Sequence, residues 1–161
     1  MRIKLFSVTL LFLFNHFFTV AQTLDKLDLT NGFKKFKFGL SPSQLSNLQE
    51  EKKVQINLKD VKNYNYIGND ITDFHGVKVE SIHLSFYKNR LYKVNVNFGS
   101  LFKEYTISEH SMVQYGLTAN YGTINHDCNE TQTTDMTVTN CTIWDGRKVR
   151  LEHIRINLLR T

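Results

Sequence analysis

Alternation of apolar and polar residues runs through much of the chain and predicts strands. Val54, Ile56 and Leu58 alternate with polar residues, as in a strand that buries one face. Tyr64 and Tyr66 alternate with asparagines in the same way. The pattern therefore indicates an antiparallel sheet with one apolar face and one polar face.

The longest alternating stretch predicts a hairpin over residues 82–98. Its two arms can bury their apolar residues together only if the connecting loop has an odd number of residues. Tyr87-Lys88-Asn89 fits as a three-residue loop, because asparagine tolerates a left-handed backbone. The apolar set is Ile82, Leu84 and Phe86 on the first arm, with Tyr92, Val94, Val96 and Phe98 on the second. The polar set on the opposite face is Ser81, His83, Ser85, Lys93, Asn95 and Asn97.

A final hairpin turns at Asp145-Gly146. The apolar residues change parity partway along both of its arms, which a single regular ladder does not accommodate. A bulge near Asn140 and another near Glu152-His153 would restore one buried face. The alternative is that both faces of this hairpin are covered.

Capping residues mark the starts of two helices. Ser41-Pro42-Ser43-Gln44 combines an N-cap serine, a proline at the first helical position and the glutamine of a capping box. The short helix that follows would bury Leu45 and Leu48 before a polar tail from Glu50 to Lys53. Thr106 and Glu109 open a longer helix, which Gly122 ends. Its apolar stripe comprises Ile107, Val113, Leu117 and Tyr121, with His110 in the middle.

Taken together, these elements predict an α+β fold, an antiparallel sheet with two helices packed on one face. The order of helix then hairpin occurs twice, over residues 33–98 and 105–158, and is compatible with two such units in series. The single proline and the lack of a low-complexity stretch favour one domain over residues 22–161.

The segment Gly39-Leu40-Ser41-Pro42-Ser43-Gln44-Leu45 resembles the helix opening of small secreted α/β modules. The SmpA-like outer-membrane assembly lipoproteins and the β-lactamase-inhibitor-protein group share it, and the stretch from Ser85 to Val96 is similar to their hairpin. The resemblance implies a protein that presents a sheet face or a loop to another protein. It brings no catalytic residues, and this chain lacks the lipid-bearing cysteine of the first group.

Residues 1–21 have the order of a secretory signal peptide. Arg2 and Lys4 precede an apolar core, and Thr19-Val20-Ala21 offers small residues for cleavage before Gln22. The apolar core is too short to span a bilayer permanently. We therefore expect a secreted or periplasmic protein without an integral membrane segment after processing.

The charge of the mature chain argues against nucleic-acid binding. Arg2 and Lys4 belong to the 20 basic residues, so 18 basic residues remain against 15 acidic ones. The densest basic run, over residues 34–37, fits a strand with Phe36 and Phe38 inward. No nucleic-acid partner is expected.

Cys128 and Cys141 are the two cysteines of the chain. In an oxidising compartment such a pair is first interpreted as a disulfide. The alternative, a zinc site, has only His126 nearby as a further ligand. We therefore expect no metal and no cofactor.

Motifs for nucleophilic catalysis, phosphate binding and metalloprotease chemistry are absent from the sequence. His110, on the buried stripe of the helix, and His83, on the polar sheet face, are the histidines to watch for catalysis, although a core role for His110 is the stronger interpretation. His83 and His153 would approach each other if the two hairpins shared a sheet. Tyr64, Tyr66, Tyr87 and Trp144 are candidate binding residues, with core or capping roles as the alternative for each.

These observations favour a monomeric, non-catalytic binding module that acts on another protein or a cell-envelope component. The first alternative is a secreted hydrolase using a histidine and a carboxylate, which requires a cleft where His83 or His110 stands within hydrogen-bond distance of an acid. The second is an inhibitor of a secreted enzyme, which requires a projecting loop over residues 129–139.

Overall fold

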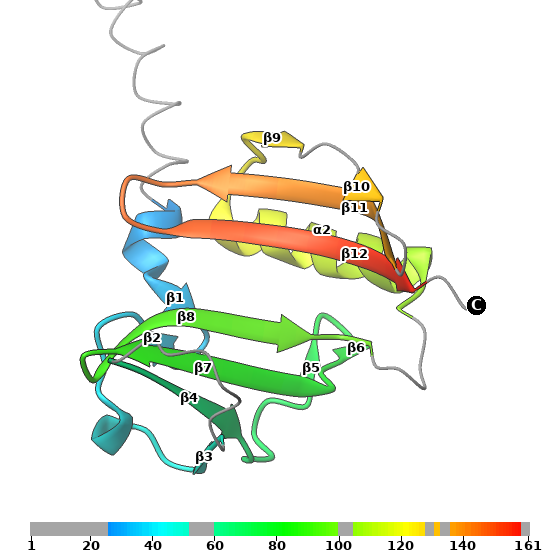
Figure 1. Cartoon of the computed structure of the whole chain (residues 1–161). Coiled ribbons are helices and arrows are strands. Elements are labelled where there is room, and N and C mark those ends of the chain that lie inside the picture. The colour runs from blue at the N-terminus through cyan, green and yellow to red at the C-terminus, as the bar shows by residue number, and fades with distance from the viewer. Residues whose placement is uncertain (1–25, 52–59, 100–104, 128–130, 133–135, 159–161) are drawn as a thin grey trace, which may run out of the picture. The chain divides into compact units, whose positions relative to one another are not determined.

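The computed structural model describes residues 26–51, 60–99, 105–127, 131–132 and 136–158. It is a mixed α and β structure with antiparallel strands in several sheets (Figure 1). The chain divides into two compact units. Unit 1 comprises Met1–Leu29 with Thr118–Thr161, and unit 2 comprises Thr30–Leu117. The α+β class is thus confirmed, whereas the boundaries of the units differ from the predicted series of residues 33–98 and 105–158.

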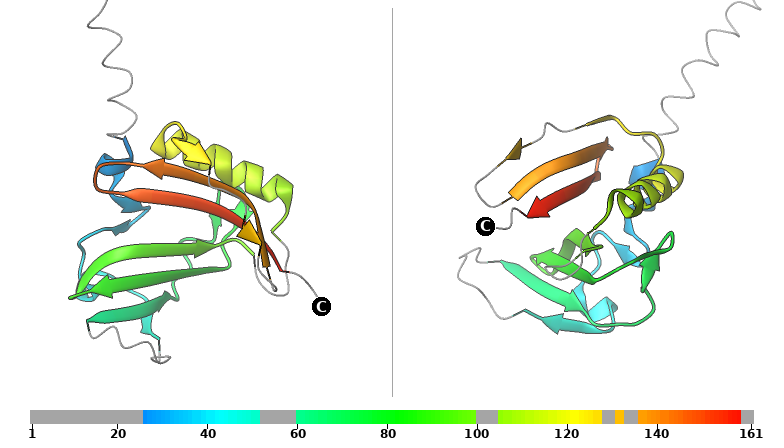
Figure 2. Two further views of the ribbon diagram at one scale, coloured as in Figure 1. Left: turned by 45° about the horizontal axis from the view of Figure 1, so that its top comes forward. Right: turned by 90° about the vertical axis from the view of Figure 1, so that its right-hand side faces the viewer.

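Unit 2 contains a four-stranded antiparallel sheet in the order β3-β4-β7-β8 (Figure 2). Its strands are β3 (Leu48–Glu50), β4 (Val61–Tyr66), β7 (Ser81–Tyr87) and β8 (Arg90–Asn97). Two small hairpins accompany it, β1 (Gly32–Phe33) with β2 (Phe36–Lys37) and β5 (Asp73–Phe74) with β6 (Val77–Lys78). The alternation at Tyr64 and Tyr66 therefore predicted a real strand, and the strand predicted at Val54–Leu58 lies outside the described residues.

The β7–β8 hairpin has the predicted faces but a different connection. Its turn holds two residues, Lys88 and Asn89, both with positive φ, as the right-handed twist of a tight hairpin requires. β8 instead contains one extra residue, Tyr92, in a bulge, because Ser85 pairs with Lys93 whereas Phe86 pairs with Leu91. Leu91 is consequently buried and Tyr92 is 49% exposed, so the prediction of Tyr92 as a core residue is wrong.

The helix predicted after Ser41 is only a 3-10 turn, Pro42–Gln44. Its capping box is formed as expected, with the Ser41 backbone N–H donating to the Gln44 side chain at 2.9 Å. Asn47 then takes a positive φ and the chain enters β3, which contains Leu48. The capping residues correctly predict where the helical turn begins, but they do not determine how many residues it contains. The prediction of a helix with a buried Leu48 is therefore wrong.

The lysine-rich segment is a tight hairpin, not the single strand predicted over residues 33–38. Lys34 and Lys35 form its turn, and Phe33 and Phe36 are buried on either side. Gly32, with φ +137°, begins β1, and a Cβ atom there would overlap the carbonyl oxygen of Phe36. The inward position of Phe36 is confirmed, while Phe38 is only half-buried.

Helix α2 (Ile107–Tyr121) begins and ends as predicted. Thr106 and Glu109 exchange the bonds of a capping box, and Gly122 follows the helix with φ +99°. His110, Val113, Leu117 and Tyr121 are buried, as their stripe predicted. Ile107 is 67% exposed, because it stands in the first turn before the buried part of the stripe. Within unit 2, the His75 ring lies against Gly116 where a Cβ would be.

Unit 1 contains a sheet built around β11 (Met136–Asp145), which pairs with β9 (His126–Asp127), β10 (Thr131–Gln132) and β12 (Arg150–Leu158). The bulge predicted near Asn140 is confirmed by a register shift between Val138 and Asn140. No second shift occurs at Glu152-His153 in the described ladder, so that prediction is wrong. Instead β12 buries His153 and Arg155 and leaves Ile154 and Ile156 partly exposed.

Asp28, in the helical segment 26–30, holds the turn of the last hairpin. Its Oδ1 accepts the backbone N–H groups of Lys148 (2.9 Å) and Val149 (3.0 Å), and its Oδ2 accepts that of Arg147 (2.8 Å). These bonds, first the one from Lys148, lower the pKa of Asp28 below its usual value. A carboxylate thus satisfies three turn donors that would otherwise face water. We refer to this arrangement as the Asp28 clamp.

Among the described residues, no helix combines the length and apolar character needed to cross a membrane. Because the helix predicted after Ser41 is only a 3-10 turn, packing on one sheet face stays a prediction for α2 alone.

Candidate functional site

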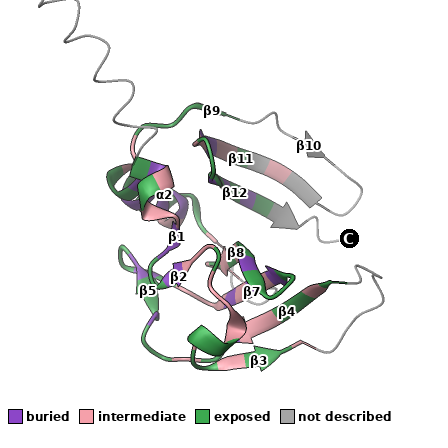
Figure 3. Ribbon diagram, turned by 90° about the vertical axis from the view of Figure 1, so that its left-hand side faces the viewer, coloured by how far each residue is buried: buried purple, intermediate pink, exposed green. Residues whose placement is uncertain are grey.

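The polar face of the unit 2 sheet is set by the register around His83. Ile82, Leu84 and Phe86 are buried, so the alternate residues of β7 point to the opposite face. Figure 3 shows the ribbon of this sheet coloured by how far each residue is buried. His83 stands opposite Asn65 on β4 and Asn95 on β8. The prediction that this face is polar is confirmed.

Four side chains on this face form a continuous series of hydrogen bonds, which we call the His83 chain. The Nδ2 amide of Asn97 donates to Ser81 Oγ over 2.8 Å. Ser81 Oγ and His83 Nε2 are 3.1 Å apart, and His83 Nδ1 and Glu51 Oε1 are 2.8 Å apart. Glu51 is held next to β4 because its backbone N–H donates to the Asn63 carbonyl at 2.9 Å.

The direction of the hydrogen bonds in the His83 chain follows from its two ends. An amide nitrogen only donates, and an ionised carboxylate only accepts. With a neutral imidazole, His83 therefore carries its proton on Nδ1 and donates it to Glu51. Its bare Nε2 accepts the hydroxyl proton of Ser81, whose oxygen accepts from Asn97. The same series of hydroxyl, imidazole and carboxylate activates serine nucleophiles on unrelated folds.

The His83 chain is accessible, since the His83 side chain is 38% exposed and that of Glu51 is 31% exposed. Sequence reasoning singled out His83 but missed its partners. Glu51 was expected in the tail of a helix, and the structure places it beside β4 instead. Ser81 and Asn97 were predicted on the same polar face as His83, but the predicted three-residue loop would place Ser81 opposite Asn95, and the observed pairing of Ser81 with Asn97 follows from the two-residue turn and the bulge.

His110 occupies a different environment. It is buried in α2 and its ring meets that of Tyr105 edge-on at 5.8 Å between centroids. This position agrees with the core role that the sequence favoured.

The four aromatic candidates do not form one surface. Tyr64 packs edge-on against Phe86, and Tyr87 is 48% exposed next to Lys88. Tyr66 is buried, and Trp144 belongs to unit 1, where its Nε1 donates to the Gly122 carbonyl at 2.8 Å. Tyr66 and Trp144 therefore have the structural roles that were the alternative for them.

Tyr66 also takes part in an ion pair. Lys35 Nζ donates to the Tyr66 hydroxyl at 2.6 Å and contacts Asp70 Oδ2 at the same distance, while the hydroxyl donates to the other Asp70 oxygen. The bond to Asp70 raises the pKa of Lys35, and the bond from Lys35 lowers the pKa of Asp70. This group is a structural tie between the β1–β2 hairpin and the end of β4.

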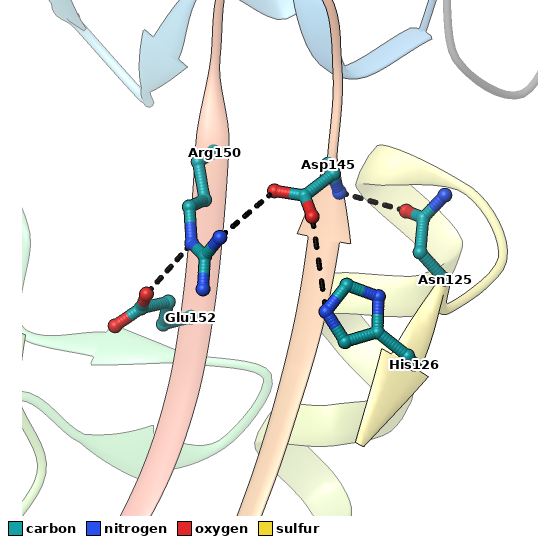
Figure 4. A network of polar contacts seen from close by, with 5 residues as sticks. All are labelled: Asn125, His126, Asp145, Arg150 and Glu152. Atoms are coloured by element: carbon teal, nitrogen blue, oxygen red, sulfur yellow. Dashed lines mark hydrogen bonds and ion pairs between the residues drawn. The ribbon is translucent and has the colours of Figure 1, made fainter. Parts of the chain in front are cut away.

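A second polar cluster lies at the turn end of the unit 1 sheet (Figure 4). Asp145 contacts Arg150 at 3.5 Å and His126 Nε2 at 3.8 Å, and Asn125 accepts its backbone N–H at 2.7 Å. Arg150 also bonds Glu152 at 2.7 Å. These exposed pairs connect β9, β11 and β12, and each contributes little to stability by itself.

His83 and His153 do not share a sheet, because β7 belongs to the sheet of unit 2 and β12 to that of unit 1. The described residues hold no cluster of three or more histidine, cysteine, aspartate or glutamate side chains placed for a metal ion. No free cysteine occurs among them. The pairing of Cys141 with Cys128 stays a prediction, since Cys128 lies outside the described residues.

Fold and site thus define an α+β protein with an open polar site on a sheet face. Comparisons with protein-family models, with curated proteins and with solved structures give no match.

Proposed function

We propose that the mature protein is a binding module exported from the cell, which holds another protein or a cell-envelope component through the polar face around His83. The observation that carries this proposal is the His83 chain. Its donors and acceptors are linked in series and still reach solvent, so a ligand meets polar groups with fixed orientation. Such preorganisation reduces the entropy lost on binding.

Two further considerations support the proposal. The leader over residues 1–21 has the pattern of an export signal. The resemblance to small secreted modules that present a sheet face to a protein partner points to the same use of the sheet. We expect the module to act as a monomer.

Affinity capture from envelope extract, with residues 22–161 immobilised, tests the proposal. His83→Ala breaks the chain at its centre, and His126→Ala serves as the matched control because it removes an exposed histidine from unit 1. We expect one or more components that bind the wild type and the control but are lost with His83→Ala. Equal recovery on all three proteins would contradict a binding role for this face.

A secreted hydrolase is the second candidate, because the pair that it requires is present. His83 Nδ1 lies 2.8 Å from Glu51, so the carboxylate can orient the imidazole and stabilise its protonated form. Glu51→Gln retains the shape but removes the charge. Turnover of a panel of simple esters by the wild type, reduced about 100-fold in this variant, would favour catalysis over binding.

The inhibitor alternative depends on a loop over residues 129–139. In the structure Thr131–Gln132 forms β10 and pairs with β11, which begins at Met136, so the expectation of one projecting loop over residues 129–139 is wrong for these residues.

A further inference from the structure

Ser81 is the member of the His83 chain whose chemistry goes beyond binding. Its hydroxyl accepts from an amide on one side and donates to a ring nitrogen on the other. We infer that Ser81 is a nucleophile for acyl transfer from carboxylic esters. This inference rests on the hydrolase candidate and names its reacting atom and substrate class.

The hydrogen-bond direction supplies the base. The Nδ1 proton of His83 is committed to Glu51, so the Nε2 lone pair faces the Ser81 hydroxyl at 3.1 Å. A serine hydroxyl is a weak nucleophile until a neighbouring base removes its proton. The carboxylate of Glu51 then stabilises the imidazolium that forms.

The reaction balances without a cofactor. Ser81 Oγ attacks the ester carbonyl carbon while its proton passes to His83 Nε2. The tetrahedral species expels the alkoxide, which takes that proton and leaves as an alcohol, so that an acyl ester of Ser81 remains. Water then attacks the acyl carbon and gives a proton to His83 Nε2. The Oγ–carbon bond breaks, the proton returns to Oγ, and a carboxylic acid leaves.

Asn97 is placed to stabilise the negative oxygen of the tetrahedral species. An amide carries two N–H groups, and the one that does not bond Ser81 can donate to an oxygen bound next to Oγ. Loss of a single side-chain donor of this kind costs about 10²–10³ in rate in serine hydrolases. Esters fit this site better than amides, because an alkoxide leaves with less assistance than an amine.

The site is also open to substrate. The side chains of His83 and Glu51 are 38% and 31% exposed. A small acyl group can therefore reach Ser81 without a change in the fold.

p-Nitrophenyl acetate tests the inference with the full mature chain. We expect release of nitrophenol together with an acetyl group located on Ser81 by peptide mass spectrometry. Ser81→Ala should lose the acetyl group and at least about 100-fold in rate. The matched control is Ser85→Ala, which removes a serine from the same face of β7 and should stay within about twofold of the wild type. Circular dichroism of each variant verifies the fold.

The other outcomes of this experiment overturn the inference, either alone or together with the hydrolase candidate. Acetylation of lysines with Ser81 unmodified, and an unchanged rate in Ser81→Ala, would overturn the inference. Turnover that survives Ser81→Ala but is lost in His83→Ala would also overturn it, while leaving a hydrolase that uses water directly. If nothing is turned over, both the inference and the hydrolase candidate fail, and the binding proposal is unaffected.

Discussion

Gly32 and Gly39 show how a backbone position restricts residue choice. Both have positive φ, but their surroundings differ. A Cβ on Gly32 would overlap the Phe36 carbonyl oxygen across the β1–β2 hairpin, whereas a Cβ on Gly39 would meet nothing within 4 Å. Conformation alone disfavours other residues at Gly39, and conformation together with sterics disfavours them at Gly32.

Alanine substitution separates the two effects. We expect Gly32→Ala to reduce the free energy of unfolding by roughly 3 kcal/mol, from backbone strain and overlap together. Gly39→Ala, which adds strain only, should cost about 1 kcal/mol. Denaturant unfolding of both variants measures the difference, and equal losses would show that the Phe36 carbonyl moves aside without cost.

Trp144 provides a second test for a single side chain. Its ring is buried and its Nε1 donates to the Gly122 carbonyl at 2.8 Å. Trp144→Phe retains most of the apolar area but leaves the carbonyl without this donor, so we expect a loss of about 1–3 kcal/mol. Trp144→Ala also creates a cavity and should lose about 3–5 kcal/mol. Thermal unfolding of the two variants gives the comparison.

The elements of the fold differ in how far sequence could predict them. The capping residues of α2 and the alternation of β7 are local signals, and both elements form where they indicate. The length of the 3-10 turn after Ser41 and the bulge beside Tyr92 depend on pairing between strands, which local pattern does not contain. For the same reason the bond between Glu51 and His83, 32 residues apart, was not foreseen, although His83 itself was.

The Asp28 clamp makes the last hairpin sensitive to acid. The bonds from the turn lower the pKa of Asp28 in the folded chain below the unfolded value of 3.8. A group with a depressed folded pKa contributes stability above its unfolded pKa, and this contribution disappears as the pH falls through the folded pKa. Protonation of Asp28 should therefore weaken unit 1 below about pH 4.

Asp28→Asn tests this acid dependence. The variant should be less stable than the wild type at neutral pH, and the difference should shrink as the pH falls from about 5 to about 2. Asp127→Asn, at an exposed aspartate of β9, is the control. Thermal unfolding at several pH values provides the measurement, and a constant difference between wild type and Asp28→Asn would show that the clamp does not depend on charge.

The whole molecule consists of a contiguous unit 2 and a unit 1 assembled from both ends of the chain. Its proposed export and its proposed disulfide are connected, because the bond between Cys128 and Cys141 would form in an oxidising compartment and close a loop within unit 1. Both proposals concern the protein that remains after the leader over residues 1–21 is removed.

Material purified from the exported fraction should therefore begin at Gln22 and resist thiol alkylation until it is reduced. Reduction should lower the free energy of unfolding by about 3 kcal/mol, the value expected for a loop of this length. N-terminal sequencing and alkylation followed by mass spectrometry check the two points. A retained leader or freely alkylated cysteines would contradict the corresponding proposal, and a Cys128→Ser, Cys141→Ser double variant would serve as the reduced reference.

The Asp28 carboxylate lies near the start of the chain, whereas the turn that it binds is synthesised almost last. Asp28 leaves the ribosome 121 residues before Val149, the most distant of its three donors. The segment between them that forms unit 2 is complete by Leu117 and can acquire its structure earlier. A product truncated before Arg147 would therefore lack all three donors of the Asp28 clamp.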